Sequence, residues 1–373
     1  MKALFVSNDP AIFTEASAVR ARMRSYANAI GELHILSSAR RDAREERDGN
    51  LFLHPVHVPK LFRVRVLTSR ARSLIQKYGI EVVSAQDPFE HGRAALRAAR
   101  GTPAKLHIQV HTDFLSPWFV KGGSAFAALL NRYRQTVADE VLPSAHGIRV
   151  VSERVKTSLV ARYGSRIPEP AVIPIAVDAA LPASIPLPPH PFTFAIIAVG
   201  RLEPEKRIED ILAALKFVNV QYKIVGLFIV GDGRERRRLE KLIRTLGLDA
   251  QVLFLGERPD ARGLMGSAQA FVQASAYEGY GRTLVEAALA EVPIITTDVG
   301  IVGDVFKKDE DALVVPIAKP IAYAHAIIQL LEDNNMRENM KIHAKEKALG
   351  HLASVSDLPG RIAADLEAAR LHR

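Results

Sequence analysis

The strongest constraint on the fold of this chain is a regular alternation of short apolar, β-branched runs with segments of helical periodicity. The runs are ALFVS, ELHIL, VVSAQ, KLHIQVH and GIRVVS in the first half, and FTFAIIAVG, YKIVGLFIVG, QVLFLG, AQAFVQAS and PIITTD in the second. We predict helices between them, over residues 16–30, 66–77, 91–100, 125–142, 153–162, 208–218, 235–246 and 283–291, and from 320 onward. Strands that alternate with helices are typical of βαβ units, so we expect parallel sheets covered by helices.

A proline-rich run divides this alternation into two series. The segment DAALPASIPLPPHP, residues 178–191, holds five prolines, which cannot join a sheet ladder or a helix interior. The length of 373 residues also exceeds what one hydrophobic core usually serves. We therefore predict an α/β fold with two doubly wound Rossmann-like lobes, over residues 1–180 and 192–350, joined by a linker over 181–191.

The ends and the composition exclude several classes of protein. The N-terminus, MKALFVSNDP, reads as a first strand and not as a cleaved signal peptide. No stretch approaches the roughly 20 apolar residues of a membrane helix, so we expect a soluble or peripheral protein. The absence of cysteine excludes disulfides, zinc thiolates and cysteine nucleophiles, and it fits a cytoplasmic location.

The net charge of +9 is concentrated in the first half of the chain. Residues 1–185 hold 26 Lys and Arg against 16 Asp and Glu. Arginines recur between apolar residues at positions 20, 22, 24, 63, 65, 70 and 72, which indicates a basic face on the first lobe. This face is a solvated surface, a site for anionic lipid headgroups on the inner membrane face, or a site for a lipid-phosphate acceptor. We find no nucleic-acid motif.

Ligands of doubly wound sheets bind beyond the carboxyl ends of strands, so the strand-to-helix turns are the candidate sites. No turn carries GxGxxG or GxxxxGK[ST], which argues against dinucleotide and P-loop sites. In the turn after FTFAIIAV, Lys206 and Arg207 precede a helix, where cations are unfavourable unless an anion offsets them. Arg201 and Lys206 could bind a diphosphate. The alternative is a surface network with the nearby glutamates 203, 205 and 209.

The turn after AQAFVQAS carries two carboxylates, Glu278 in a loop and Glu286 in the first turns of a helix. Gly279 and Gly281 let the backbone approach a ligand, and the first amides of the helix, from residues 282–284, could point at a phosphate. Glu286 could accept hydrogen bonds from ribose hydroxyls. In the competing interpretation, Thr283 and Glu286 form a capping box that needs no ligand.

A third turn lies in the first lobe, where KLHIQV ends at His111. A lone histidine is usually structural, but this one lies at the carboxyl end of a strand beside an apolar loop. Asp113 could orient its ring or cap the following turn. Trp118 and Phe119 are either a membrane-contacting tip or part of the core.

The segments VGRLEPEKRIEDILAAL, IVGDGRERRRLEKLIRTLGLDAQVLFLGE and EGYGRTLVE, with VPIITTDVG after them, resemble the retaining glycosyltransferases of family four (group 1). The likeness runs in order and spacing from Thr193 to about Pro316. It implies the GT-B fold, in which an acceptor-side and a donor-side lobe face a central cleft. It also implies that the C-terminal helix, within 351–373, crosses back to the first lobe.

The resemblance implies a role for each matching residue. The expected catalytic residues are His111, near the reacting sugar, and Glu278, facing the transferred sugar. The expected donor-binding residues are Arg201 and Lys206 for the diphosphate, Glu286 for the ribose, Arg258 beside the base, and Gly279, Tyr280, Gly281, Arg282, Thr283 and Leu284 through their backbone. Many relatives carry paired glycines after the first strand, whereas this chain has NDPAIFTEASAVRARM, so the acceptor side departs from the family pattern.

The reaction expected is transfer of a sugar from a nucleotide-diphosphate sugar to a hydroxyl acceptor, which is a glycan, a lipid-linked compound or a small molecule. Arg201, Lys206 and a helix N-terminus would offset the charge of the leaving diphosphate, so we expect no metal and no other cofactor. The separate surroundings of Glu278 and Glu286 argue against a two-carboxylate hydrolase. The remaining alternatives are a sugar-nucleotide epimerase of the same fold and a catalytically silent relative that binds a membrane or a partner.

Overall fold

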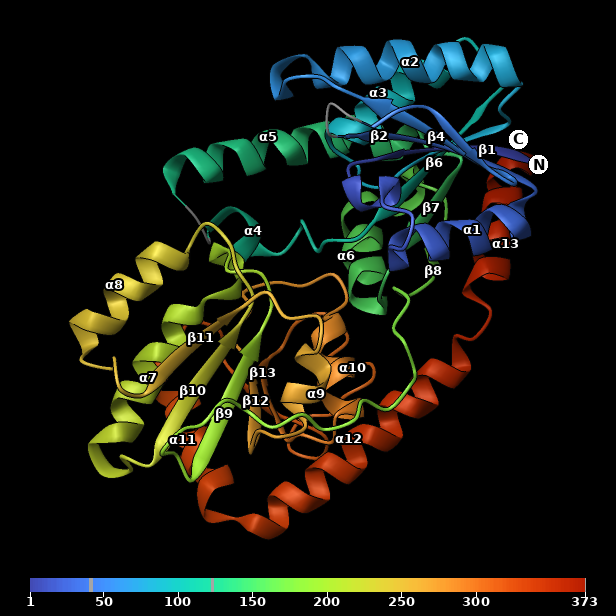
Figure 1. The fold of residues 1–373 in the computed structure, drawn as a ribbon. Coiled ribbons are helices and arrows are strands. Elements are labelled where there is room, and N and C mark those ends of the chain that lie inside the picture. The colour runs from blue at the N-terminus through green and yellow to red at the C-terminus, as the bar shows by residue number, and fades with distance from the viewer. Residues whose placement is uncertain (40–42, 122–123, 373) are drawn as a thin grey trace. The chain divides into compact units, whose positions relative to one another are not determined.

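The structure is a computed structural model, and it describes residues 1–39, 43–121 and 124–372 (Figure 1). The chain forms two compact units. Unit 1 comprises Met1–Leu115, Phe126–Pro174 and Asp357–Arg373, and unit 2 comprises Ser116–Ala125 and Ile175–Ser356. Each unit is an α/β lobe with its own sheet, which confirms the predicted fold class.

Unit 1 is built on a sheet whose described strands run in the order β3-β4-β2-β1-β5-β6-β7-β8. All neighbours in it are parallel except β3 and β4. The strands are β1 (Lys2–Ser7), β2 (Glu32–Ser38), β3 (Glu46–Asp48), β4 (Leu51–Val56), β5 (Val82–Ala85), β6 (Lys105–Val110), β7 (Gly147–Val150) and β8 (Ala171–Val172). The helices are α1 (Ala18–Ile30), α2 (Arg63–Tyr78), α3 (Glu90–Ala99), α5 (Ala125–Val141), α6 (Glu153–Tyr163) and α13 (Leu358–Leu371).

Unit 2 is built on a parallel sheet in the order β11-β10-β9-β12-β13-β14. Its strands are β9 (Phe194–Val199), β10 (Val225–Val230), β11 (Val252–Gly256), β12 (Ala270–Gln273), β13 (Ile294–Thr297) and β14 (Leu313–Val315). Its helices are α4 (Pro117–Lys121), α7 (Ile208–Gln221), α8 (Arg236–Leu246), α9 (Ala261–Met265), α10 (Arg282–Leu289), α11 (Pro320–Glu332) and α12 (Asn334–Ser354). Strand β9 lies in mid-sheet between β10 and β12, which places the β9 and β12 carboxyl ends side by side.

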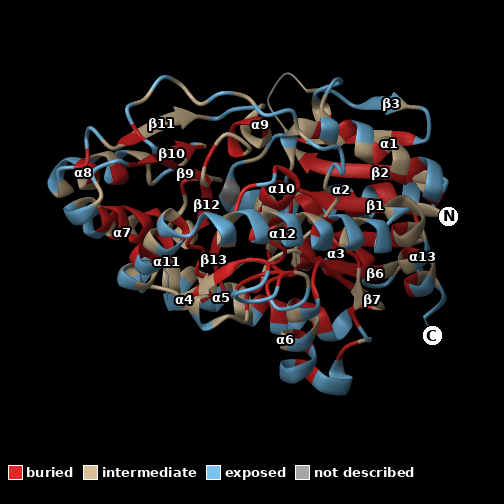
Figure 2. Cartoon of the chain, turned by 90° about the horizontal axis from the view of Figure 1, so that it is seen from below, coloured by how far each residue is buried: buried red, intermediate tan, exposed pale blue. Residues whose placement is uncertain are grey.

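Local sequence signals explain many of these boundaries. Ser17 caps α1, because its hydroxyl accepts a hydrogen bond from the Arg20 amide at 3.1 Å. Gly79 ends α2 in the left-handed conformation that favours glycine. The continuous apolar runs become central strands buried on both faces, as Figure 2 shows for β1 and β2, whereas the outward face of α12 is exposed.

The predicted helices agree with the structure within a few residues at each end, for example 16–30 against Ala18–Ile30 for α1. The sequence did not predict the hairpin of β3 and β4. The acidic residues of β3 in this hairpin change the expected basic face of the first lobe. Arg20 is only 2% exposed, and its guanidinium contacts Glu46 and Asp48 of β3. Arg20 is therefore a buried structural residue and not part of a basic surface.

The two units differ from a division at residues 181–191 in three segments, the shortest of which is 175–180, since unit 2 begins at Ile175. Segment 116–125 belongs to unit 2, because Trp118 stacks on the Arg207 guanidinium and Phe119 packs edge-on against Tyr277, with ring centroids 5.5 Å apart. The interpretation as a membrane-contacting tip is thus wrong for Phe119, which is 6% exposed, whereas Trp118 is partly exposed. The C-terminal helix α13 belongs to unit 1 and packs beside α1 (Figure 1).

No helix in the described part of the chain is long and apolar enough to cross a membrane.

Candidate active site

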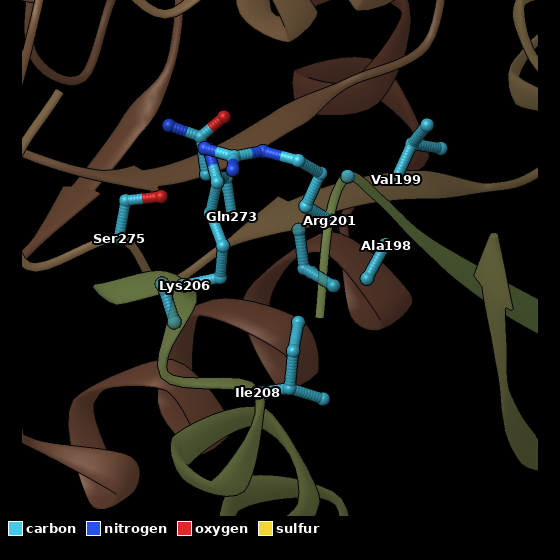
Figure 3. A pocket seen from close by; sticks show the side chains of 10 residues that line it. Ala198, Val199, Arg201, Lys206, Ile208, Gln273 and Ser275 are labelled. Atoms are coloured by element: carbon cyan, nitrogen blue, oxygen red, sulfur yellow. The ribbon is translucent and has the colours of Figure 1, made fainter. Parts of the chain in front are cut away.

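The carboxyl ends of β9 and β12 bring two of the predicted turns together. The strands are neighbours, with Ile196 paired to Ala270, and the loops beyond them are joined by a hydrogen bond from the Ala276 amide to the Glu205 carbonyl at 2.8 Å. A small pocket lies between the two strand ends (Figure 3). It is lined by Ala198, Val199, Gly200, Arg201, Lys206, Ile208, Val272, Gln273, Ala274 and Ser275.

Lys206 and Glu278 form an ion pair at this pocket. The distance from Lys206 Nζ to Glu278 Oε1 is 2.5 Å, and the two side chains are 19% and 16% exposed. The Ser275 hydroxyl donates to the same carboxylate oxygen at 2.7 Å. Lys206 ends the short 3-10 turn Pro204–Lys206, whereas Glu278 lies in the loop after β12. The structure therefore joins two residues that the sequence places 72 positions apart.

Arg201 extends from the loop after β9 and is 74% exposed. Its nearest carboxylate is Glu205, 3.7 Å away, which is a loose contact that water screens. In Figure 3 the Arg201 guanidinium reaches over the pocket near the side chain of Gln273. The exposed cation is thus Arg201, whereas Lys206 is held in place by Glu278.

Arg207 does not need the external anion that its position suggested. Its guanidinium makes two hydrogen bonds to Asp210, at 2.7 and 2.9 Å, and it adopts a left-handed backbone with φ of 48° before α7. Of the predicted surface network, the loose pair of Arg201 with Glu205 is present, whereas Lys206 pairs with Glu278 and Glu203 pairs with Arg234. Among the cations of this turn, Arg201 and Lys206 are the ones that line the pocket.

The capping-box interpretation of Thr283 and Glu286 is wrong. Helix α10 starts at Arg282 with Gly281 as its N-cap, so Thr283 lies inside the first turn. The Thr283 hydroxyl donates instead to Gln273 Oε1 on β12, at 2.7 Å. Glu286 is 8% exposed, its pKa is raised by burial, and its ion pair is with Arg282, at 3.0 Å. The Glu286 carboxylate is therefore not used to cap the helix.

The loop before α10 is held by close backbone packing. Gly281 has φ of 87°, and a Cβ on Gly300 would lie 2.3 Å from the Tyr280 carbonyl oxygen. The Tyr280 ring is 1% exposed, its hydroxyl contacts His351 Nε2 at 2.9 Å, and burial raises its pKa. Tyr280 can therefore reach a ligand only through its backbone. The Leu284 amide donates to the Gly281 carbonyl at 2.9 Å, which leaves Arg282 and Thr283 as the helix-start donors.

Arg258 lies in the loop after β11, and it is not among the residues that line the pocket. Its guanidinium makes two hydrogen bonds to Asp260, at 2.7 and 2.6 Å. The predicted contact of Arg258 with a nucleotide base stays a prediction.

His111 lies in unit 1, directly after β6. Its Nε2 contacts Gln109 Oε1 at 3.1 Å, so the ring partner is Gln109 and not the Asp113 that the sequence suggested. Burial, together with the nearby positive charge of Arg149, lowers the pKa of His111 to about 3. His111 is therefore a neutral imidazole over the whole physiological pH range.

Sequence reasoning missed four polar residues around these sites: Ser275, Gln273, Gln109 and Arg149. Each lies on a strand or directly after one, and each is at most 6% exposed. The sequence did contain a signal for these residues, since a polar residue at the carboxyl end of a buried strand needs a hydrogen-bond partner. No cluster of three His, Asp or Glu side chains that could hold a metal ion occurs in the described residues.

Two sequence families match the chain, one in each half. The model described as Glycosyltransferase Family 4 matches residues 19–181, and the model described as Glycosyl transferases group 1 matches residues 191–347. Among characterised relatives, the lipopolysaccharide core biosynthesis glycosyltransferase LpsD of Rhizobium meliloti is 32% identical over 41% of this chain and 43% of its own length. The N-acetyl-alpha-D-glucosaminyl L-malate synthase of Bacillus anthracis is 28% identical over 40% of this chain and 39% of its own length. The chain thus spans about half the length of the curated relatives it matches.

Solved structures share the fold over the whole chain. Sucrose-phosphate synthase from Thermosynechococcus elongatus has a TM-score of 0.81 at 20% identity, over 99% of this chain and all of that one. HepE from Anabaena, solved with UDP and glucose, has a TM-score of 0.74 at 19% identity, over 98% and 99% of the two chains.

Proposed function

We propose a reaction for this chain from one premise: it belongs to the group 1 glycosyltransferases of family four, whose two sequence models match residues 191–347 and 19–181. The reaction is transfer of a sugar from a nucleotide-diphosphate sugar to a hydroxyl acceptor, with retention at the anomeric carbon. The single observation that carries this proposal is the pocket between β9 and β12, where Lys206 is held by Glu278 beside the exposed Arg201.

The charges of the pocket suit a leaving diphosphate. The bond from the anomeric carbon to the diphosphate breaks, and its electron pair remains on the diphosphate oxygen. Lys206, fixed by Glu278, which Ser275 orients in turn, supplies a positioned point charge, while Arg201 can close on the phosphate oxygens with two parallel hydrogen bonds. Preorganised charges of this kind stabilise the transition state without a metal ion.

The acceptor completes the reaction on the same face of the sugar. Its oxygen bonds to the anomeric carbon, and its proton passes to an oxygen of the departing diphosphate. The products are the glycosylated acceptor and a nucleoside diphosphate. Glu278 then has an electrostatic and positioning role toward the sugar, and Glu286, buried and paired with Arg282, accepts hydrogen bonds from the ribose.

The names of the relatives support a class of donor and product. HepE was solved with UDP and glucose, and the pneumococcal transferase GtfA, which this chain matches over 60% of its length, was solved with UDP and GlcNAc. LpsD belongs to lipopolysaccharide core synthesis. We therefore propose a uridine diphosphate sugar as donor and a polysaccharide or glycolipid as product, made in the cytoplasm.

The experiment is a screen of UDP-, GDP- and ADP-sugars that measures release of the nucleoside diphosphate, with and without EDTA. We expect one donor class to be turned over, EDTA to have no effect, and Lys206→Ala to lower kcat by about 100- to 1000-fold. Lys345→Ala is the matched control, since Lys345 forms an ion pair of similar geometry with Glu291, at 2.6 Å, elsewhere in unit 2. If EDTA abolished turnover, the proposed role of Arg201 and Lys206 in place of a metal ion would be overturned. If the donor sugar were epimerised and not transferred, the chain would be a sugar-nucleotide epimerase.

We also propose that unit 1 contacts an anionic membrane surface. Support comes from Leu61 and Phe62, which are 86% and 55% exposed directly before Arg63 and Arg65 at the start of α2. Apolar side chains flanked by cations are typical of peripheral membrane contacts. Vesicles with phosphatidylglycerol should pull down the protein at low salt, and the double variant Leu61→Ser, Phe62→Ser should bind less. Equal binding of the double variant would contradict this contact.

A further inference from the structure

We infer that Arg149 and Gln109 are positioning residues that fix His111 as the Nε2–H tautomer, so that its Nδ1 is left as a hydrogen-bond acceptor. The inference rests on the proposed function in one respect, namely that His111 acts beside the transferred sugar. The tautomer itself follows from the hydrogen bonds of unit 1 alone.

Arg149 determines which atoms donate and which accept in the hydrogen-bond network around His111. It lies on β7, it is 4% exposed, and its guanidinium donates to the carbonyls of Ile173 and Pro174 at 3.0 and 2.8 Å. Its third contact is with Gln109 Oε1, at 2.9 Å. A guanidinium can only donate, so the Gln109 atom that faces it must be the carbonyl oxygen. The orientation of the Gln109 amide is thereby fixed by chemistry.

The same oxygen of Gln109 lies 3.1 Å from His111 Nε2. Because a carbonyl oxygen only accepts, His111 Nε2 must carry the hydrogen. A neutral imidazole has one hydrogen, and burial beside the positive charge of Arg149 keeps this ring neutral. His111 Nδ1 is therefore an acceptor, and within residues 1–39, 43–121 and 124–372 no hydrogen bond reaches it.

The amide nitrogen of Gln109 is also held by a hydrogen bond. Its Nε2 donates to the Ser84 hydroxyl on β5 at 2.9 Å, and Ser84 Oγ lies 2.8 Å from Nδ1 of His107. His107 Nε2 in turn lies 2.9 Å from the Asp365 carboxylate on α13. A continuous chain of hydrogen-bonded polar groups, buried at His107, Ser84 and Gln109, thus runs from the C-terminal helix to His111, and rotation of Gln109 would break contacts at both ends.

The fixed tautomer restricts what His111 can recognise. An Nδ1 lone pair accepts a hydrogen bond, so it can meet a hydroxyl group but repels a phosphate oxygen or a carboxylate. His111 therefore selects a sugar that carries a hydroxyl where it meets the ring. A donor sugar that is deoxygenated at this position should lose kcat, because the His111 acceptor would lose its hydrogen-bond donor in the bound state.

The first test is nitrogen-15 NMR of the histidine side chains in the full chain, with His111 assigned through His111→Asn. We expect a hydrogen on Nε2 and no titration of His111 between pH 8 and pH 5. A hydrogen on Nδ1, or a protonation midpoint near 6.5, would overturn the inference. This result does not depend on finding a donor, so it stays separate from a failure of the proposed function.

The second test compares three variants of the network. Gln109→Met removes the acceptor for His111, and we expect kcat to fall about 10- to 100-fold while KM for the donor changes by less than about threefold. Gln109→Glu keeps the acceptor but adds a negative charge, which should move the acid limb of the kcat/KM profile to higher pH. Ser84→Ala is the control, because it removes the contacts of Ser84 with Gln109 Nε2 and His107 but leaves the Gln109 oxygen that meets His111 in place.

The alternative to this inference is that Gln109 has a purely structural role. In that case Gln109→Met and Ser84→Ala would lower Tm alike, Gln109→Glu would leave the pH profile in place, and the NMR signal of His111 would not change in any of them. This set of results would overturn the inference even if all variants fold.

Discussion

Glu278 matters at the scale of single residues because one of its oxygens accepts two hydrogen bonds. Lys206 and Ser275 both donate to Oε1, and this arrangement fixes the carboxylate relative to the pocket. A charge-assisted hydrogen bond between partly buried groups contributes about 1.5–3 kcal/mol, more than a neutral one. Glu278 is therefore the residue that holds the Lys206 ammonium group in position before a donor binds.

The variants Glu278→Gln and Ser275→Ala should separate the charge of this carboxylate from its orientation. Glu278→Gln removes the ion pair, and we expect kcat for donor turnover to fall about 100-fold. Ser275→Ala removes one neutral donor, and we expect a loss of about 10-fold or less. Steady-state kinetics with the best donor measures both. A larger loss in Ser275→Ala than in Glu278→Gln would contradict this division of roles.

His111 should make stability depend on pH. Below about pH 6.5 the unfolded chain protonates His111, whereas the folded chain does not do so until about pH 3. The unfolded state then binds more protons, so stability falls as pH falls through this window. Between pH 6.5 and pH 5 the loss from His111 alone should be about 1.6 kcal/mol. Groups that modulate it are Asp87, Arg22 and Arg149.

Urea unfolding of the wild type and of His111→Asn at pH 6.5 and pH 5 measures this effect. All other titratable groups are the same in the two proteins, so their contributions cancel in the difference. A difference between the two proteins that does not change with pH would contradict the account of His111.

At the scale of elements, the start of α10 depends on one close approach of two backbones. Gly300 has φ of 59°, and a Cβ there would meet the Tyr280 carbonyl oxygen at 2.3 Å. We expect Gly300→Ala to destabilise the protein by more than about 2 kcal/mol and to weaken donor binding, because the loop carrying Glu278 must shift. Gly303→Ala is the matched control, since Gly303 also has positive φ but has no atom within 4 Å of the added Cβ.

Thermal unfolding of the two glycine variants gives the comparison directly. Equal losses in Tm would show that backbone strain alone is responsible. The packing of the loop on Gly300 would then not hold the donor site in place.

Helices and strands could be predicted where one period dominated the pattern. Helix α1 follows a clear amphipathic pattern after Ser17. Its predicted and observed first residues differ by two, and its last residue agrees. The strand β3, by contrast, is the polar triplet Glu46–Asp48, whose ladder partner is β4 and whose charges pair with Arg20 of α1. Partners that lie outside the local window leave no periodic signal, so this hairpin could not be predicted.

At the scale of the whole molecule, the division into two α/β lobes and the positions of the candidate turns could be predicted from the sequence. The rule that ligands bind at the carboxyl ends of strands located Lys206 and Glu278, and the order of strands in the sheet then placed them together. The pairing of Thr283 with Gln273 could not be predicted, because it crosses from a helix to a strand while the local pattern matched a capping box. The same holds for Gln109 and Arg149, whose contacts cross three strands.

The central claim is that the pocket between β9 and β12 binds the diphosphate of a nucleotide sugar through Lys206. The most direct measurement is calorimetric titration of UDP, GDP and ADP into the wild type, Lys206→Ala and the control Lys345→Ala. We predict that at least one nucleotide binds the wild type and Lys345→Ala with the same Kd, and that Lys206→Ala weakens this Kd about 10- to 100-fold. Binding of no nucleoside diphosphate, or equal binding by all three proteins, would contradict the claim.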